Sequence, residues 1–344
     1  KELLLAEASV VPEVFQTPRC GAHDPPERYA YAGRSVVYPG GSLGKLPWRY
    51  VPLSSGAGDV SDRVLMTAGE FDWGWLDAFM RLSSADVTHP MLAWLVAAAR
   101  RNEVDHFPLL FVSGSSGVGK STLARLGCRM LGSAVGANLG QSTPFTLLTH
   151  LASTTTFPVF VDEWTRKSRR DARDAMQESI PALYEGGTAM RGRSDLSIAT
   201  YRLLAPVVVA GEDAFSLDRE VERMVVVHPT RDAQDAGALA AVSGAPVERF
   251  ARLLYTWLLG SDSLPEPPRG DAATRPLHNV AVLEWGWETL LAFTHDAAAL
   301  DPDVPELPPV PDLTGTVCDQ VDDENAYEVA VREGTDEIGA VAVV

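Results

Sequence analysis

The segment 111–122, FVSGSSGVGKST, places the tightest limits on how this chain can fold. It fits the pattern G-x-x-x-x-G-K-[ST], in which glycines let the backbone wrap closely around a phosphate group. The apolar run 109–112 precedes the loop, and residues 123–131 follow it with apolar side chains at helical spacing. We therefore predict a phosphate-binding loop between a buried strand and a helix.

In such a loop, the backbone N–H groups and the N-terminus of the following helix would surround the β- and γ-phosphates of a bound nucleotide. The Lys120 ammonium, which we expect on an exposed loop, would add positive charge, and the Ser121 hydroxyl would coordinate Mg²⁺. The residues predicted to bind the nucleotide are Gly114, Ser115, Ser116, Gly117, Val118, Gly119, Lys120, Ser121 and Thr122.

A second apolar run, 157–161, ends in Asp162 and Glu163, about 40 residues after the loop. We expect this strand to lie beside the loop strand and to deliver both carboxylates to the same edge of a sheet. Asp162 would bind Mg²⁺ through water, and Glu163 would polarise the attacking water. The alternative is a strand that simply ends at solvent; the nearby loop motif favours a catalytic pair.

The fold class follows from four apolar runs that alternate with predicted helices, at 109–112, 157–161, 203–210 and 224–228. This alternation predicts an α/β fold with a mostly parallel sheet flanked by helices. The core would span 105–232. Before it we expect a β-containing leader at 1–65, with strands at 29–32, 34–38 and 48–51. Two amphipathic helices within 66–104 would then pack on the edge of the core. A helical region at 233–300 would form a lid or side domain, and an acidic tail at 301–344 would close with a β-hairpin.

The net charge of −17 argues against contact with nucleic acid, so its distribution matters. Residues 301–344 contain twelve acidic residues and one arginine, which leaves the first 300 residues only weakly acidic. Basic residues cluster at 167–173 and 191–193, and the second cluster falls in a predicted β-hairpin with Arg191 and Arg193 at its tip. These arginines are candidates for DNA phosphate contacts; the alternative is a solvated face.

Other classes of protein are disfavoured by what the sequence lacks. No apolar run of about 20 residues and no signal peptide is present, and the three cysteines lie far apart. We expect no membrane segment, structural zinc or disulfide framework, and a cytoplasmic location.

Five stretches within 89–228 carry a family resemblance: HPMLAWLVAAA, LLFVSGSSGVGKSTLARLGCRMLG, VFVDEW, LYEGGTAMRGRS and APVVVAGE. They resemble the P-loop ATPase module of phage and plasmid primase-helicase replication proteins, which are helicase-like ATPases of mobile elements. The resemblance implies ATP and Mg²⁺ as cofactors, a homo-oligomeric and most often hexameric ring, single-stranded DNA as a partner, and a primase or polymerase domain nearby.

The resemblance also implies roles for three further residues. Glu212 would take the place of a polar sensor residue at the γ-phosphate, commonly Asn in replicative helicases, so this chain departs from that pattern. Arg223 is the first candidate for an arginine that reaches the γ-phosphate bound to a neighbouring subunit, and Arg219 is the second candidate. The alternative for either arginine is a surface ion pair with Glu220 or Glu222.

Two functions remain open at this point. The first is a ring-forming helicase or translocase that moves on DNA during replication of a mobile element. The second is a regulatory or anti-phage defence ATPase whose nucleotide-gated assembly controls protein partners. The net acidity favours the second, because an acidic surface repels nucleic acid. Most of that acidity lies in the tail, however, so we favour the motor; a metabolic kinase is a more distant third.

Overall fold

A computed structural model describes residues 70–192, 198–213, 215, 218–261, 263–270, 272 and 274–314, together with the backbone of four short strands between residues 21 and 45. Its centre is a five-stranded parallel sheet in the order β11-β5-β10-β7-β6. The strands are β5 (Leu109–Ser113), β6 (Gly136–Asn138), β7 (Val159–Trp164), β10 (Val207–Gly211) and β11 (Met224–Val227). The predicted α/β fold is confirmed.

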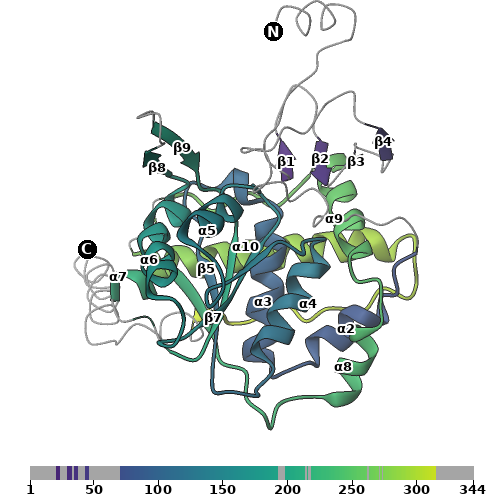
Figure 1. The fold of residues 1–344 in the computed structure, drawn as a ribbon. Helices are drawn as coiled ribbons and strands as arrows, with labels where there is room; N and C mark the ends of the chain where they lie inside the picture. The colour runs from purple at the N-terminus through teal and green to yellow at the C-terminus, as the bar shows by residue number, and fades with distance from the viewer. Residues whose placement is uncertain are drawn as a thin grey trace, which may run out of the picture.

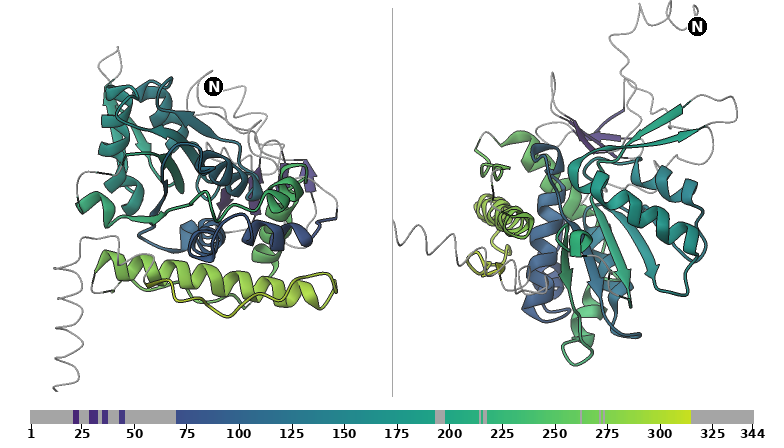
Figure 2. Two further views of the ribbon diagram at one scale, coloured as in Figure 1. Left: turned by 90° about the horizontal axis from the view of Figure 1, so that it is seen from below. Right: turned by 90° about the vertical axis from the view of Figure 1, so that its left-hand side faces the viewer.

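Helices cover both faces of this sheet, which is why its central strands are continuous apolar runs. One face carries α3 (Ala85–Ala98) and α4 (Lys120–Met130), and the other carries α5 (Pro144–Leu151) and α6 (Arg170–Glu185) (Figure 2). Every residue of β5, β10 and β11 is buried. The carboxyl ends of the parallel strands therefore form the accessible edge where a site can be built.

The strand order differs from the sequence prediction at one place. We expected β7 beside β5, but β10 lies between them, with Val208 paired to Leu110 on one side and to Phe160 on the other. An apolar run shows that a strand is buried and does not identify its neighbours. β6 was missed altogether, because its three residues, Gly-Ala-Asn, have no apolar period.

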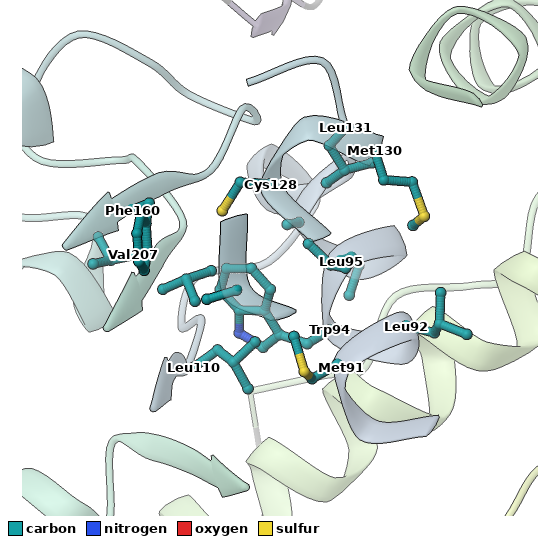
Figure 3. Packing of buried hydrophobic residues seen from close by; sticks show 14 of the residues in the cluster. Met91, Leu92, Trp94, Leu95, Leu110, Cys128, Met130, Leu131, Phe160 and Val207 are labelled. Atoms are coloured by element: carbon teal, nitrogen blue, oxygen red, sulfur yellow. The ribbon is translucent and has the colours of Figure 1, made fainter. Parts of the chain in front are cut away.

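The helices predicted to pack on the core's edge are α2 (Gly74–Met80) and α3, and α3 belongs instead to the interior. Residues 91–98 of α3 are almost completely buried between the sheet and α10 (Arg275–Ala298). Figure 3 shows Met91 and Trp94 of α3 on the side of Leu110 of β5, and the Trp94 indole donates a 2.7 Å hydrogen bond to the carbonyl of Pro108. The edge prediction is therefore wrong for α3.

The long helix α10 runs along the outer side of α3 (Figure 2). A Cβ atom placed on Gly286 would lie 2.0 Å from the carbonyl oxygen of Ala93, so only glycine allows the two helices to cross this closely. Trp287 and Leu290 of α10 belong to the same hydrophobic core as the sheet. The predicted lid or side domain is therefore wrong for α10, although α8 (Ala236–Ser243) and α9 (Arg249–Gly260) confirm that this region is helical.

The remaining elements lie around this core. The four leader strands form an antiparallel sheet near α9 (Figure 1), and a two-stranded hairpin follows α6. Among the described residues, no helix is both long and apolar enough to cross a membrane. The strand predicted at 48–51 and the hairpin predicted at the end of the acidic tail lie outside the described residues. The bounds are β1 (Gly21–His23), β2 (Tyr29–Ala32), β3 (Ser35–Val37), β4 (Leu43–Lys45), η2 (Arg101–Glu103), β8 (Thr188–Gly192), β9 (Ile198–Arg202) and α7 (Asp218–Val221).

Candidate nucleotide-binding site

The glycine-rich loop connects the end of β5 to the start of α4, as the motif predicts. Gly117 and Gly119 have φ angles of 81° and 78°, in the left-handed region that glycine reaches without steric cost. The Gly114 N–H donates a 3.3 Å hydrogen bond to the carbonyl of Gly211, which ties the loop to the neighbouring strand β10. Residues 115–117 are exposed, so a phosphate could approach their backbone from solvent.

The Lys120 side chain folds back into this loop. Its ammonium donates a 2.6 Å hydrogen bond to the carbonyl of Ser115, and the residue is only 8% exposed. The expectation of an exposed lysine is therefore wrong. Burial under the loop holds the positive charge beneath the backbone that would surround a phosphate, so the charge needs little rearrangement to reach one.

Ser121, at the second position of α4, joins the loop to the predicted carboxylate pair. Its hydroxyl donates a 2.8 Å hydrogen bond to Asp162 Oδ1 of β7, although β10 separates β7 from β5, the strand that leads into the loop and α4. The other oxygen, Asp162 Oδ2, lies 3.4 Å from the Arg125 guanidinium of α4. A hydroxyl and a carboxylate side by side are the kind of oxygen ligands that Mg²⁺ takes alongside phosphate and water, so this pair fits the expected metal.

Glu163 adopts an unusual backbone conformation at the end of β7. Its φ angle of 63° is positive, which among the described residues occurs at no other residue except glycines. Its N–H donates a 3.0 Å hydrogen bond to Asp162 Oδ1, and its carbonyl accepts a bond from the Ser168 hydroxyl. The side-chain oxygen Oε2 lies beside Gly140, after β6, where an added Cβ would be 2.7 Å away. Strain of this kind is often stored at functional sites.

Glu212 follows the end of β10, between the strands that carry the loop and the carboxylate pair. Its side chain is exposed, and its N–H donates a 3.1 Å hydrogen bond to the carbonyl of Trp164. Gly211 brings the two strands together here, because an added Cβ would lie 2.4 Å from that same carbonyl oxygen. Phe215 stacks on the Trp164 ring at 4.1 Å and packs this junction from one side.

The two arginines predicted to act on a neighbouring subunit differ in exposure. Arg223 is 9% exposed, lies 3.7 Å from the Glu185 carboxylate, and donates to the backbone carbonyl of Arg219. The Arg219 side chain is exposed. The ion pairs considered for Arg223 do not form, because Glu220 accepts two hydrogen bonds from Gln177 and Glu222 pairs with Arg275 at 2.9 Å.

The predicted hairpin is confirmed as β8 and β9, an antiparallel pair whose last paired residues are Gly192 and Ile198. Arg191 lies in β8 opposite Ala199, whereas Arg193 lies outside the described residues. The hairpin projects from the body of the protein (Figure 1), with Met190 and Ile198 strongly exposed on it.

Sequence reasoning missed two residues on the segment after β11. An added Cβ on Gly117 would lie 3.4 Å from the Arg231 guanidinium, and one on Gly119 would lie 3.1 Å from the Gln234 amide nitrogen. The Arg231 and Gln234 side chains therefore lie against the glycine-rich loop. No local motif marks them, because their role depends on the return of the chain to the loop about 110 residues later.

Comparison with known proteins adds little to this geometry. No protein-family model matches the sequence, and no curated protein matches it. Among solved structures, the chain is similar to the apo structure of the NrS-1 C-terminal region (305–718), at 12% identity and a TM-score of 0.40, over 81% of this chain and 62% of that one. The A form of the apo NrS-1 C-terminal region gives 12% identity and a TM-score of 0.41, over 88% of this chain and 70% of that one. The chain thus spans less than two thirds of the first of these, and function rests on the site.

The fold and the site together define an α/β protein with a glycine-rich loop, a serine and a carboxylate joined at the carboxyl edge of a parallel sheet.

Proposed function

We propose that this chain is a Mg²⁺-dependent ATP hydrolase. The observation that carries the proposal is the 2.8 Å hydrogen bond from the Ser121 hydroxyl to Asp162 Oδ1. These residues are 41 positions apart, Ser121 on α4 and Asp162 on β7, yet they form a direct contact where the glycine-rich loop enters α4. That convergence is what a nucleotide site needs, with phosphate donors and metal ligands within one small volume.

Each residue then has a role that its position allows. The backbone N–H groups of 115–119 hold the β- and γ-phosphates, and Lys120 exchanges its bond to the Ser115 carbonyl for a phosphate oxygen. Ser121 and Asp162 would hold Mg²⁺, which would neutralise part of the phosphate charge. Glu163 accepts a proton from water as the water oxygen attacks the γ-phosphorus, and the bond to the β–γ bridging oxygen breaks to leave ADP.

The Glu163 side chain must rotate to reach the attacking water, because its carboxylate lies beside Gly140, on the β6 side of the sheet. Glu212, which follows the intervening strand β10, would orient the water from the other side. Arg219 is the better of the two arginine candidates for contact with a neighbouring subunit, because Arg223 is buried and engaged within its own subunit.

We further propose that ATP hydrolysis drives movement on single-stranded DNA within a ring, most often a hexamer. The hairpin supports this, because α6 leads to it from the segment after Glu163 and β10 leads from it back to Glu212. A conformational change at the nucleotide site can therefore be transmitted to the hairpin through α6 at one end and through β10 at the other. Arg191 and Arg193 are the residues proposed to hold DNA phosphates.

The second candidate is a regulatory ATPase that controls protein partners, favoured by the net charge of −17. ATP turnover with and without single-stranded DNA, together with the mass of the assembly, separates the two. Stimulation by DNA in a ring-sized assembly is expected for the motor, whereas unstimulated turnover would favour the regulator. Absence of turnover in every condition would refute the hydrolase.

Two variant sets refine this test. Replacing Arg191 and Arg193 with Ala should weaken DNA binding and reduce the slope of log affinity against log salt by about 0.7 per lost contact, with basal turnover retained. Mixing Arg219→Ala with Lys120→Ala chains should restore partial turnover, because one junction then pairs an intact loop with an intact arginine. An unchanged salt slope would contradict the DNA contacts of Arg191 and Arg193. No recovery of turnover in a mixed assembly would contradict the action of Arg219 on a neighbouring subunit.

A further inference from the structure

The chain between the end of β7 and the first turn of α6 carries five basic residues, all within 166–173. Two of them are held by this same stretch of chain. Arg169 pairs with Asp171 at 2.6 Å, and the Arg173 guanidinium donates a 3.2 Å hydrogen bond to the carbonyl of Thr165. The other three basic residues are therefore the ones that a partner can reach.

These three residues, Arg166, Lys167 and Arg170, present their charges to solvent. The Arg166 side chain is 88% exposed and lies 3.7 Å from the Asp213 carboxylate. The Arg170 side chain is 90% exposed and lies 3.6 Å from the Asp174 carboxylate. Lys167 is exposed and forms no ion pair with any residue that the structure describes. Because long, exposed ion pairs contribute little, all three cations remain available to an anion.

The N-terminus of α6 lies at the same surface and also favours an anion. Its N-cap is Arg169, whose side chain does not cap the helix, and its first residue is Arg170. Cations are unfavourable here because the helix dipole is positive at this end, and Asp171, the acidic residue of the first turn, is already paired with Arg169. An anionic partner would therefore interact favourably with both the side chains and the helix end.

Hydrogen bonds hold the backbone that carries these cations. The Arg166 N–H donates to the Asp213 carboxylate, after β10, and the Ser168 hydroxyl donates to the carbonyl of Glu163. A partner thus meets a turn that is already ordered, so its binding costs less conformational entropy than the ordering of a loop would.

An acidic partner of matching charge is present in the same chain. Residues 315–344 of the acidic tail contain eight acidic residues and one arginine, a net charge of −7. They follow Leu313, which is buried in the core, and thirty residues can span up to about 100 Å when extended. A folded chain of this size is only about 50 Å across, so the tail can reach this surface.

Nucleic acid is the other polyanion that three exposed cations could bind. The net charge of −17 opposes the approach of any free polyanion from solution. The tail does not have to overcome this barrier, because covalent attachment gives it an effective concentration in the millimolar range, at which individually weak ion pairs are sufficient. The charges therefore favour the tail as the occupant.

We propose that Arg166, Lys167 and Arg170 form a docking surface for residues 315–344 of the same chain. The docked tail covers the chain that leads from Glu163 to α6, and another polyanion binds there only by displacing it. This contact needs no nucleotide, so it can be tested whether or not the chain hydrolyses ATP.

Lys167 allows a direct test on the full chain, because the other lysines are only Lys1, Lys45 and the buried Lys120. A carbodiimide joins an amine to a carboxylate where the two are in contact. We expect peptide mapping to find Lys167 joined to acidic residues at 319–337, at a several-fold higher yield than Lys45. This yield should fall by about threefold or more in about 1 M NaCl, where the Debye length is only about 3 Å.

Two matched variants locate the contact. Arg170→Gln removes one cation of the docking surface and keeps Lys167 as the reporter, so the yield of cross-links between Lys167 and the tail should fall by about twofold or more. Arg81→Gln is the control, because Arg81 is also an exposed arginine that pairs with an aspartate four residues away, and it should leave the yield unchanged. Both side chains project into solvent, so neither variant should shift the unfolding midpoint.

Three results would overturn the docking surface. The first is that Lys167 forms no cross-link with the tail, or no more than Lys45 does. The second is that Arg170→Gln and Arg81→Gln change the yield equally. The third is that the cross-linked product runs on a denaturing gel at the mass of two chains, which would make a second copy the occupant; docking within one chain predicts a product with the mass of a single chain.

Discussion

Replacing Gly211 with Ala tests whether the site depends on the close approach of β10 to β7. The φ angle of Gly211 lies outside the left-handed region, so the backbone itself accepts alanine and the effect is purely steric. The added Cβ would lie 2.4 Å from the carbonyl oxygen of Trp164 and 2.6 Å from its Cβ. Ordinary contact requires about 3.4 Å or more, so β7 and β10 must separate locally by about 1 Å.

The size of the effect follows from what these strands carry. Trp164 comes directly after Asp162 and Glu163, and Glu212 comes directly after Gly211, so a shift of 1 Å moves both sides of the site. A misplacement of about 1 Å can reduce turnover by about 10²-fold. The 3.1 Å bond from the Glu212 N–H to the Trp164 carbonyl would also be lost, and the overpacking should lower the free energy of unfolding by about 1–3 kcal/mol.

The assay measures ATP turnover, ATP affinity and the denaturant midpoint for Gly211→Ala and for Gly136→Ala. In the control, the added Cβ would meet the Phe160 carbonyl at 2.8 Å, but Gly136 begins the edge strand β6, which can shift outward. We expect Gly211→Ala to lose turnover by about 10²-fold while the control loses less than about fivefold. Normal turnover and stability in Gly211→Ala would refute the proposed contact between the strands.

Four further predictions concern individual residues. Lys120→Ala should abolish turnover by loss of phosphate charge compensation, whereas Glu163→Gln should keep ATP binding and lose hydrolysis by about 10² or more; turnover within a few-fold of wild type in either would refute its role. Gly286→Ala should lower the free energy of unfolding, measured by denaturant titration, by about 2 kcal/mol. The added Cβ would lie 2.0 Å from the Ala93 carbonyl oxygen, and this clash costs more than the better helix propensity of alanine gains. A gain in stability would contradict this packing. Burial raises the pKa of the Cys128 thiol, so little reactive thiolate forms at pH 8. Peptide mapping after iodoacetamide treatment at pH 8 should therefore find Cys128 unmodified until the chain is unfolded. Labelling of Cys128 in the native chain would contradict its burial.

The parts of the site that the sequence predicts are those encoded by neighbouring residues. The glycine-rich loop is a local motif, and Asp162 and Glu163 end an apolar run, so both could be placed on a strand-to-helix turn and a strand end. The fold class was predictable for the same reason, because β5, β10 and β11 are buried on both faces and read as continuous apolar runs.

The parts that escaped prediction depend on long-range packing. Nothing in the composition of β10 indicates that it lies between β5 and β7, since β5, β10 and the first half of β7 are all short runs of buried apolar residues. The run 278–293 predicts a helix but not where it packs, and Gly286, which allows α10 to cross α3 closely, has no local signal. Arg231 and Gln234 reach the loop only because the chain returns there after β11.

The central claim is that the loop and β7 form one Mg²⁺-nucleotide site through Ser121 and Asp162. The most direct test is a double-mutant cycle of Ser121→Ala and Asp162→Asn, read as the increase in ATP affinity that Mg²⁺ produces. We predict that Mg²⁺ tightens ATP binding to the wild type, that each single variant loses most of this effect, and that the double variant loses no more than either. Losses that add independently, or a wild type whose ATP affinity does not respond to Mg²⁺, would contradict the claim.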